Sequence, residues 1–118
     1  MRPLLVVLLL VLTVGVAAAD VAGAPLPKRA RALEDGRYAS PLGFRDTVDW
    51  YRKELRRRGI NVTLDGPTRF RDVVYLRVLP TDAASTWSAV HIVLADGRTT
   101  IYILAASEAG ASSPPLEN

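Results

Sequence analysis

The 118-residue chain has no cysteine and only one histidine. The absence of cysteine excludes a disulfide framework, thiol redox chemistry and cysteine-ligated zinc. One histidine is too few for a structural zinc site built on nitrogen ligands. We therefore expect no metal and no cofactor, and a domain whose stability comes from a packed apolar core.

The chain also has no apolar run long enough to cross a membrane. Its longest run, residues 4–12, falls well short of the roughly 20 apolar residues that a spanning helix needs. Arg2 precedes this run and the small residues Ala17–Ala19 follow it, which is the order of a secretory signal peptide. The pattern predicts that residues 1–19 are a signal peptide that touches the membrane only in transit.

Signal peptidase requires small side chains at two positions before the cut. Ala17 and Ala19 meet this requirement, so we expect cleavage before Asp20 and export to the periplasm or the medium. An exported domain without disulfides is typical of bacteria. The released chain has 99 residues, enough for one domain and too few for two. It carries 14 basic against 12 acidic residues, because only Arg2 leaves with the peptide.

Both ends of the released chain are polar and lack apolar periodicity. Residues 20–40 contain two prolines and several basic residues, and they predict a flexible N-terminal arm. Residues 106–118 are small, polar and proline-containing, and they predict a disordered C-terminal tail. The folded α+β domain is therefore expected at residues 41–105.

Residues 44–58 have the apolar spacing of an amphipathic helix. Phe44, Val48, Tyr51 and Leu55 recur at intervals of four, three and four, which places them on one stripe of a 3.6-residue period. Gly59 follows the stripe and predicts a left-handed C-terminal cap.

After this glycine the period changes to two, which predicts strands at about 60–64, 73–79, 87–94 and 99–105. We expect turns at Asp65-Gly66-Pro67 and at the hairpin dipeptide Asp96-Gly97. The hairpin register pairs Ile92 with Ile101, Val90 with Ile103, His91 with Tyr102 and Val93 with Thr100, so that apolar residues meet on one face. The sequence thus predicts a two-layer α+β fold, with the helix across one face of a four-stranded antiparallel meander.

The opposite face of the predicted sheet mixes aromatic, charged and apolar side chains. Such a face could bind a ligand, receive a partner protein or form a homodimer. Aromatic and β-branched residues also occupy exposed strand faces simply because they suit the pleat. The candidate residues on this face are Tyr75, Arg77, Trp87, His91 and Tyr102.

A second candidate surface is the cluster of basic side chains at the end of the helix and on the loop expected after the first strand. It could bind lipid headgroups, an anionic envelope polymer or an acidic protein patch, or it could be a solvated helix face. Nucleic acid is not expected as a partner of an exported protein. The candidate anion-binding residues are Arg52, Lys53, Arg56, Arg57, Arg58, Arg69 and Arg71, with Lys28, Arg29 and Arg31 on the arm.

An enzyme built on this chain would use His91 as its acid or base. Ser85, Ser88, Asp72 and Asp82 supply the other residue types of a hydrolytic triad, but no nucleophile elbow or other local signature accompanies them. No catalytic residue is therefore assigned.

The helix sequence from Phe44 to Leu55, the following Gly59, the strand Trp87-Ser-Ala-Val-His-Ile and the later Ile-Tyr-Ile are core and packing residues. Over about residues 40–105 this combination resembles small exported bacterial domains of unknown function. The resemblance implies the helix-then-sheet order and brings no activity with it. Our leading hypothesis is an exported, non-enzymatic binding or interaction module for an unidentified protein or anionic envelope component. A small enzyme and an accessory subunit of a cell-envelope assembly are the alternatives.

Overall fold

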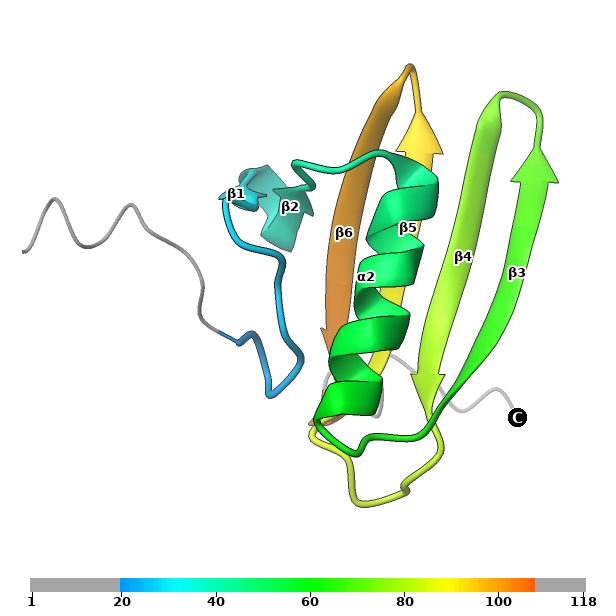
Figure 1. The fold of residues 1–118 in the computed structure, drawn as a ribbon. Coiled ribbons are helices and arrows are strands. Elements are labelled where there is room, and N and C mark those ends of the chain that lie inside the picture. Colours follow the sequence, from blue (N-terminus) through cyan, green and yellow to red (C-terminus); the bar gives the residue numbers. More distant parts are fainter. Residues whose placement is uncertain (1–19, 108–118) are drawn as a thin grey trace, which may run out of the picture.

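The computed structural model describes residues 20–107. Six strands form one antiparallel sheet in the order β1-β2-β6-β5-β4-β3, and helix α2 lies across one face of it (Figure 1). The α+β class is confirmed, and the four strands that follow the helix form the expected antiparallel meander. Two further strands precede the helix, so the sheet has six strands where four were expected. The elements are β1 (Arg31–Ala32), the 3-10 helix η1 (Glu34–Gly36), β2 (Arg37–Ala39), α2 (Phe44–Arg57), β3 (Val62–Phe70), β4 (Val73–Pro80), β5 (Trp87–Ala95) and β6 (Arg98–Ala105).

Helix α2 buries the stripe that its spacing predicts. Tyr51 and Leu55 are fully buried, and Phe44 is partly buried against the same core. The helix ends at Arg57, and Gly59 adopts the left-handed conformation predicted for it, with a φ of 76°. The amide of Gly59 donates to the carbonyl of Arg56, and the amide of Ile60 donates to the carbonyl of Leu55, both at 2.9 Å. This pair of bonds satisfies carbonyls that the helix end would otherwise leave without donors.

The hairpin of β5 and β6 has the predicted register. Asp96 and Gly97 both adopt positive φ, 54° and 72°, as a two-residue hairpin turn requires. The cross-strand pairs are those expected, with Ile92 opposite Ile101 and His91 opposite Tyr102. Ile92 and Ile101 are fully buried beneath α2, so this register provides the centre of the core.

The turn predicted at Asp65-Gly66-Pro67 is wrong. Strand β3 continues through these residues to Phe70, and its register with β4 shifts between Asp65 and Thr68. A glycine with positive φ followed by a proline suits a bulge in an edge strand as well as it suits a turn, because neither residue needs a regular ladder bond there. The chain reverses instead at Arg71 and Asp72, so Arg69 lies within a strand and not on a loop.

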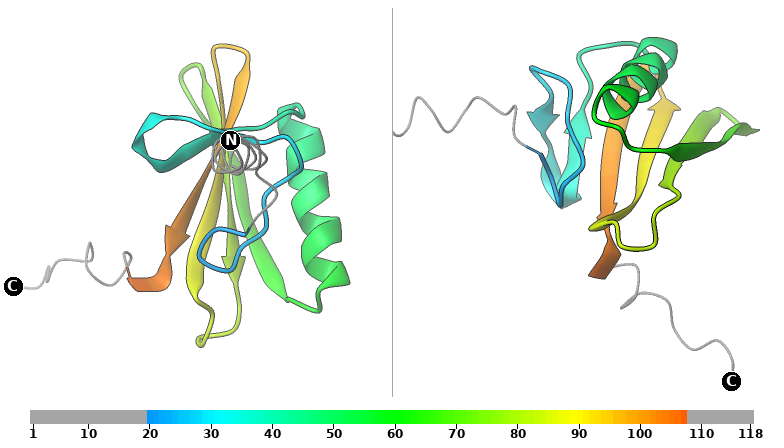
Figure 2. Two further views of the ribbon diagram at one scale, coloured as in Figure 1. Left: turned by 90° about the vertical axis from the view of Figure 1, so that its left-hand side faces the viewer. Right: turned by 60° about the horizontal axis from the view of Figure 1, so that its bottom comes forward.

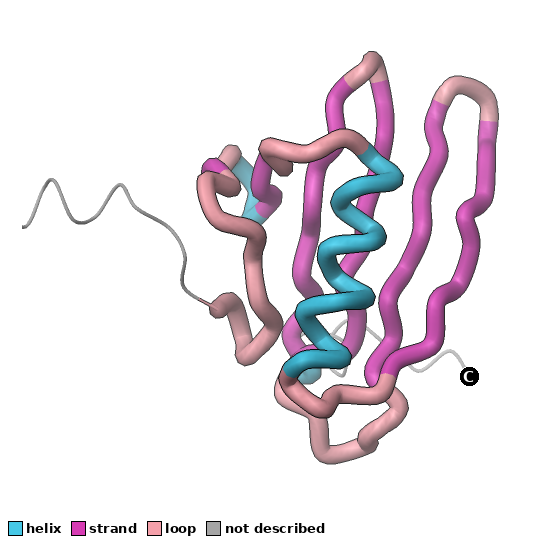
Figure 3. The backbone as a smooth tube through the Cα atoms, viewed as in Figure 1, coloured by secondary structure: helices cyan, strands magenta, loops and turns pink. Residues whose placement is uncertain are grey.

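The structure also differs from the flexible arm expected at residues 20–40. Residues 20–30 have no regular helix or strand (Figure 3), yet Ala24, Leu26 and Ala30 belong to the buried core. The hydroxyl of Tyr51 donates a buried hydrogen bond of 2.7 Å to the carbonyl of Pro25. Composition could not predict this packing, because the contacts that bury the segment join residues far apart in the chain.

The remainder of that region forms the β1–β2 hairpin, whose second strand pairs with β6. Its turn contains Asp35 and Gly36, both with positive φ, which is the same dipeptide that closes the β5–β6 hairpin. The hairpin stands out from the sheet on the side away from α2 (Figure 2). The predicted signal peptide, with Ala17 and Ala19, lies outside the described residues, as does most of the predicted C-terminal tail.

Helix α2 covers the sheet unevenly. It packs against β5, and residues 20–30 fill the space along one of its flanks (Figures 1 and 2). On the other flank, toward the edge strand β3, the apolar side chains of Val62, Leu64 and Val74 are only partly buried. The uneven cover leaves a groove between α2 and β3.

Candidate functional site

The sheet face away from α2 carries most of the aromatic residues that the sequence placed there. The rings of His91 and Tyr102 lie edge to face, with their centres 6.1 Å apart. Arg77 donates to the carboxylate of Asp65 on the neighbouring strand, so its charge is already paired. Partial burial, and secondarily the charge of Arg77, lower the pKa of His91, which keeps the imidazole neutral at physiological pH. Tyr75 is the exposed aromatic of this face.

Trp87 is not on this face, contrary to expectation. It is 3% exposed and packs in the core with the residues beneath α2. The pairing of β5 with β6 shifts between Trp87 and Ala89, so the two-residue alternation that placed Trp87 beside His91 breaks at that point. The residue therefore contributes to stability and does not belong to a candidate surface.

Three residues of the enzyme alternative make hydrogen bonds with backbone groups of residues other than His91. The hydroxyl of Ser85 donates to the carbonyl of Trp87 at 2.7 Å, and that of Ser88 donates to the carbonyl of Leu104 at 3.3 Å. Asp82 accepts the amide of Ala84. Within residues 20–107, no group of three or more His, Cys, Asp or Glu side chains is placed to hold a metal ion.

Two of the predicted anion-binding residues have carboxylate partners. Arg57 donates to Glu54 at 3.1 Å, and Arg58 donates both to Glu54 and to Asp20 at 2.9 Å. The hydrogen bonds from Arg57 and Arg58 lower the pKa of Glu54 to about 2. These two arginines and two carboxylates form a balanced network, and we do not count Arg57 and Arg58 as available to an external anion.

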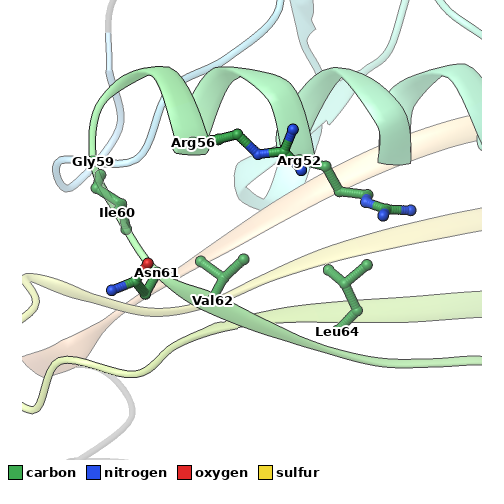
Figure 4. A pocket seen from close by; sticks show the side chains of 7 residues that line it. All are labelled: Arg52, Arg56, Gly59, Ile60, Asn61, Val62 and Leu64. Carbon is green, nitrogen blue, oxygen red and sulfur yellow. The ribbon is translucent and has the colours of Figure 1, made fainter.

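Arg52 and Arg56 lie on another side of the helix and face β3. They extend over a floor formed by Ile60, Val62 and Leu64 (Figure 4). Neither makes an ion pair with any carboxylate among residues 20–107. Arg56 and Arg57 are adjacent in the sequence but have different surroundings, because consecutive helical residues are about 100° apart around the helix axis.

The groove continues along the helix toward the β3–β4 hairpin. We call the whole hollow the α2–β3 groove. Its second half adds an apolar floor and two more basic side chains, Arg45 on the helix and Arg69 on β3, and Asp49 is its single carboxylate among the described residues. The described residues that line it are Arg52, Arg56, Gly59, Ile60, Asn61, Val62 and Leu64 in the first half, and Phe44, Arg45, Val48, Asp49, Gly66, Pro67, Arg69, Val74, Leu76 and Leu94 in the second.

The other predicted basic residues are not gathered at this groove. The guanidinium of Arg71 lies over the exposed ring of Phe70 at the β3–β4 turn, 5.3 Å from its centre. Lys53 and Arg29 are exposed elsewhere, Arg31 is in β1, and Lys28 lines a hollow between residues 26–28 and the end of α2. Sequence reasoning missed Arg45, because it lies at the start of the helix, away from the basic cluster at its end.

No protein-family model, curated protein or solved structure matches the chain. In the part of the chain that the structure describes, no helix is both long enough and apolar enough to cross a membrane.

Proposed function

We propose that the protein is an exported, non-enzymatic binding module and that it binds an anionic ligand in the α2–β3 groove. The observation that carries this proposal is the contrast within one helix. Arg57 and Arg58 are paired with Glu54 and Asp20, whereas Arg52 and Arg56 extend over an apolar floor without a carboxylate partner in residues 20–107.

The surroundings of Arg52 and Arg56 favour an anion with an apolar part. A guanidinium forms two parallel hydrogen bonds to a carboxylate or phosphate, and its attraction to the anion strengthens where nearby apolar groups lower the effective dielectric constant. Val62 and Leu64 provide such groups directly below the two arginines (Figure 4). Arg45 and Arg69 extend the positive potential along the rest of the groove.

A matched pair of variants tests the proposal. Arg56→Gln and Arg57→Gln are adjacent in the sequence and remove the same charge, but only the first changes the groove. Titrated with fluorescently labelled poly-L-glutamate at low salt, Arg56→Gln and Arg52→Gln should each bind several-fold more weakly than the unaltered protein, as expected for the loss of about 1 kcal/mol per charge pair. Arg57→Gln should bind within about twofold of it.

The salt dependence gives a second readout. Binding should weaken as ionic strength rises, because salt screens the attraction between exposed arginines and a polyanion, with a Debye length of about 10 Å at 0.1 M. Equal losses in Arg56→Gln and Arg57→Gln would show that only net charge matters, and the groove would not be the site. No binding at low salt to poly-L-glutamate, heparin or vesicles containing phosphatidylglycerol would refute the proposed function as a whole.

A further inference from the structure

Strand β3 forms one outer edge of the sheet. Among the strands of residues 20–107 it pairs with β4 alone, at the end of the strand order. Edge strands usually carry features that prevent another strand from pairing with them, such as bulges, prolines or charged side chains that point inward. The second half of β3 has such features, since its register shifts between Asp65 and Thr68 and Pro67 has no amide proton to donate.

The first half of β3 is regular, and its alternation shows which backbone groups face outward. The carbonyl of Asn61 accepts the amide of Thr81 at 3.1 Å, so these two residues form a hydrogen-bonded pair. Hydrogen-bonded and non-hydrogen-bonded pairs alternate along an antiparallel ladder. The N–H and C=O groups of Val62 and Leu64 therefore point away from β4. The pairing of Val62 with Pro80, which has no N–H, agrees with this assignment.

The same two residues line the α2–β3 groove. The side chains of Val62 and Leu64 face α2, below Arg52 and Arg56 (Figure 4). Their outward backbone N–H and C=O groups form the edge of the sheet. A strand added at this edge would place every second side chain on the helix side of the sheet, because directly opposed residues share a face. Those side chains would lie next to the guanidinium groups of Arg52 and Arg56.

We propose that the ligand of the groove is an extended acidic peptide segment that adds to β3 as an antiparallel strand. This inference rests on the proposed function and deepens it by naming the partner. Backbone hydrogen bonds to Val62 and Leu64 supply affinity, and carboxylates at alternate positions pair with Arg52 and Arg56, which supplies selectivity. A second copy of this chain fits the edge less well, because pairing of two β3 strands would bring two rows of arginines together.

The experiment compares peptides that differ only in backbone methylation. The probe is an acetylated and amidated hexapeptide of alternating glutamate and threonine. When it pairs with β3, glutamates lie opposite Val62 and Leu64 on the helix side, and their amides point toward β3. N-methylation of the glutamates should therefore abolish binding, whereas N-methylation of the threonines, whose amides point outward, should leave it within about threefold.

Amide hydrogen exchange gives an independent readout. In the unbound protein the outward amides of Val62 and Leu64 should exchange quickly, whereas the amide of Thr63, which faces β4, should already be protected. Saturating peptide should slow exchange at Val62 and Leu64 by about tenfold or more, with little change at Thr63. Arg56→Gln should weaken binding of the peptide several-fold, and Arg57→Gln should not.

The outcomes separate this inference from the proposed function. Both methylated peptides could bind as well as the unmethylated peptide, while Arg56→Gln still weakens the binding of all three peptides. That result would show that the groove binds anions without strand addition, and it would refute only this inference. The amides of Val62 and Leu64 could instead be protected from exchange without peptide, to a degree that grows with protein concentration. That result would identify a second copy of the chain as the occupant and would also overturn this inference. If neither the peptides nor poly-L-glutamate binds, both proposals are wrong.

Discussion

Replacing Tyr51 with phenylalanine removes one buried hydrogen bond and leaves the ring in place. The Tyr51 hydroxyl donates to the carbonyl of Pro25 at 2.7 Å, and both residues are fully buried. Burial, and secondarily the negative charge of Asp20, raise the pKa of Tyr51 far above its ordinary value, so the hydroxyl stays protonated as a donor. This bond fastens residues 20–30 to the helix.

The expected effect follows from leaving a buried acceptor without a donor. Such a loss costs about 1–3 kcal/mol, because the carbonyl of Pro25 recovers neither the hydroxyl nor bulk water. A small domain has only about 5–15 kcal/mol of stability. A loss of about 2 kcal/mol should lower Tm by about 8–16 °C for a domain of this size.

Urea unfolding followed by tryptophan fluorescence measures this effect, since Trp87 is buried and the ring of Trp50 lies 4.9 Å from that of Tyr51. Tyr75→Phe is the matched control, because Tyr75 is exposed and the same hydroxyl is removed. We expect the control to change stability by less than about 0.5 kcal/mol. If the two variants are equally stable, residues 20–30 are not held in the way described.

Three further predictions concern the helix and the core. Gly59→Ala should cost about 1 kcal/mol in chemical denaturation, because a side chain is strained at a φ of 76° even though a methyl group there meets no other atom. Gly43→Ala, at the N-cap with a φ of −68°, should cost less, and an equal cost would contradict this reasoning. The pKa of Glu54 is about 2 in the folded chain, against an ordinary value of 4.5. The contribution of Glu54 to stability is therefore present above pH 4.5 and is lost as the pH falls toward 2. Glu54→Gln should flatten this part of the stability–pH profile, and an unchanged profile would contradict the pairing with Arg57 and Arg58. Ile92→Ala should cost about 2–5 kcal/mol in urea unfolding, because the fully buried side chain leaves a cavity, and a cost below about 1 kcal/mol would place Ile92 outside the core.

The candidate site could be predicted from the sequence only in part. The basic cluster on the helix is visible in the sequence, and a helical period separates Arg56 from Arg57. The position of the helix on the sheet decides which of these two arginines lies at the groove. The ion pairs that Glu54 and Asp20 make with Arg57 and Arg58 also depend on the tertiary structure. Asp20 is 38 residues from Arg58, and no local pattern predicts that contact.

The open edge beneath the arginines was also beyond sequence reasoning. The residues of the first half of β3 were predicted to be a strand, but Asp65-Gly66-Pro67 indicated that the strand stopped there. The same residues are compatible with a turn and with a bulge, because both can use a glycine with positive φ and tolerate a proline. Only the pairing of Thr68–Phe70 with Val73–Tyr75 decides between them.

The sequence by itself determined the elements whose causes are local. The apolar stripe of α2, the glycine cap after it and the Asp96-Gly97 turn each depend on residues a few positions apart, so the helix, its end and the β5–β6 register follow from spacing and backbone preference. Tertiary structure alone decided that residues 20–30 join the core, that Trp87 turns inward, and that α2 leaves the flank toward β3 partly uncovered. Those outcomes depend on which surfaces meet after folding, and contacts between distant residues set them.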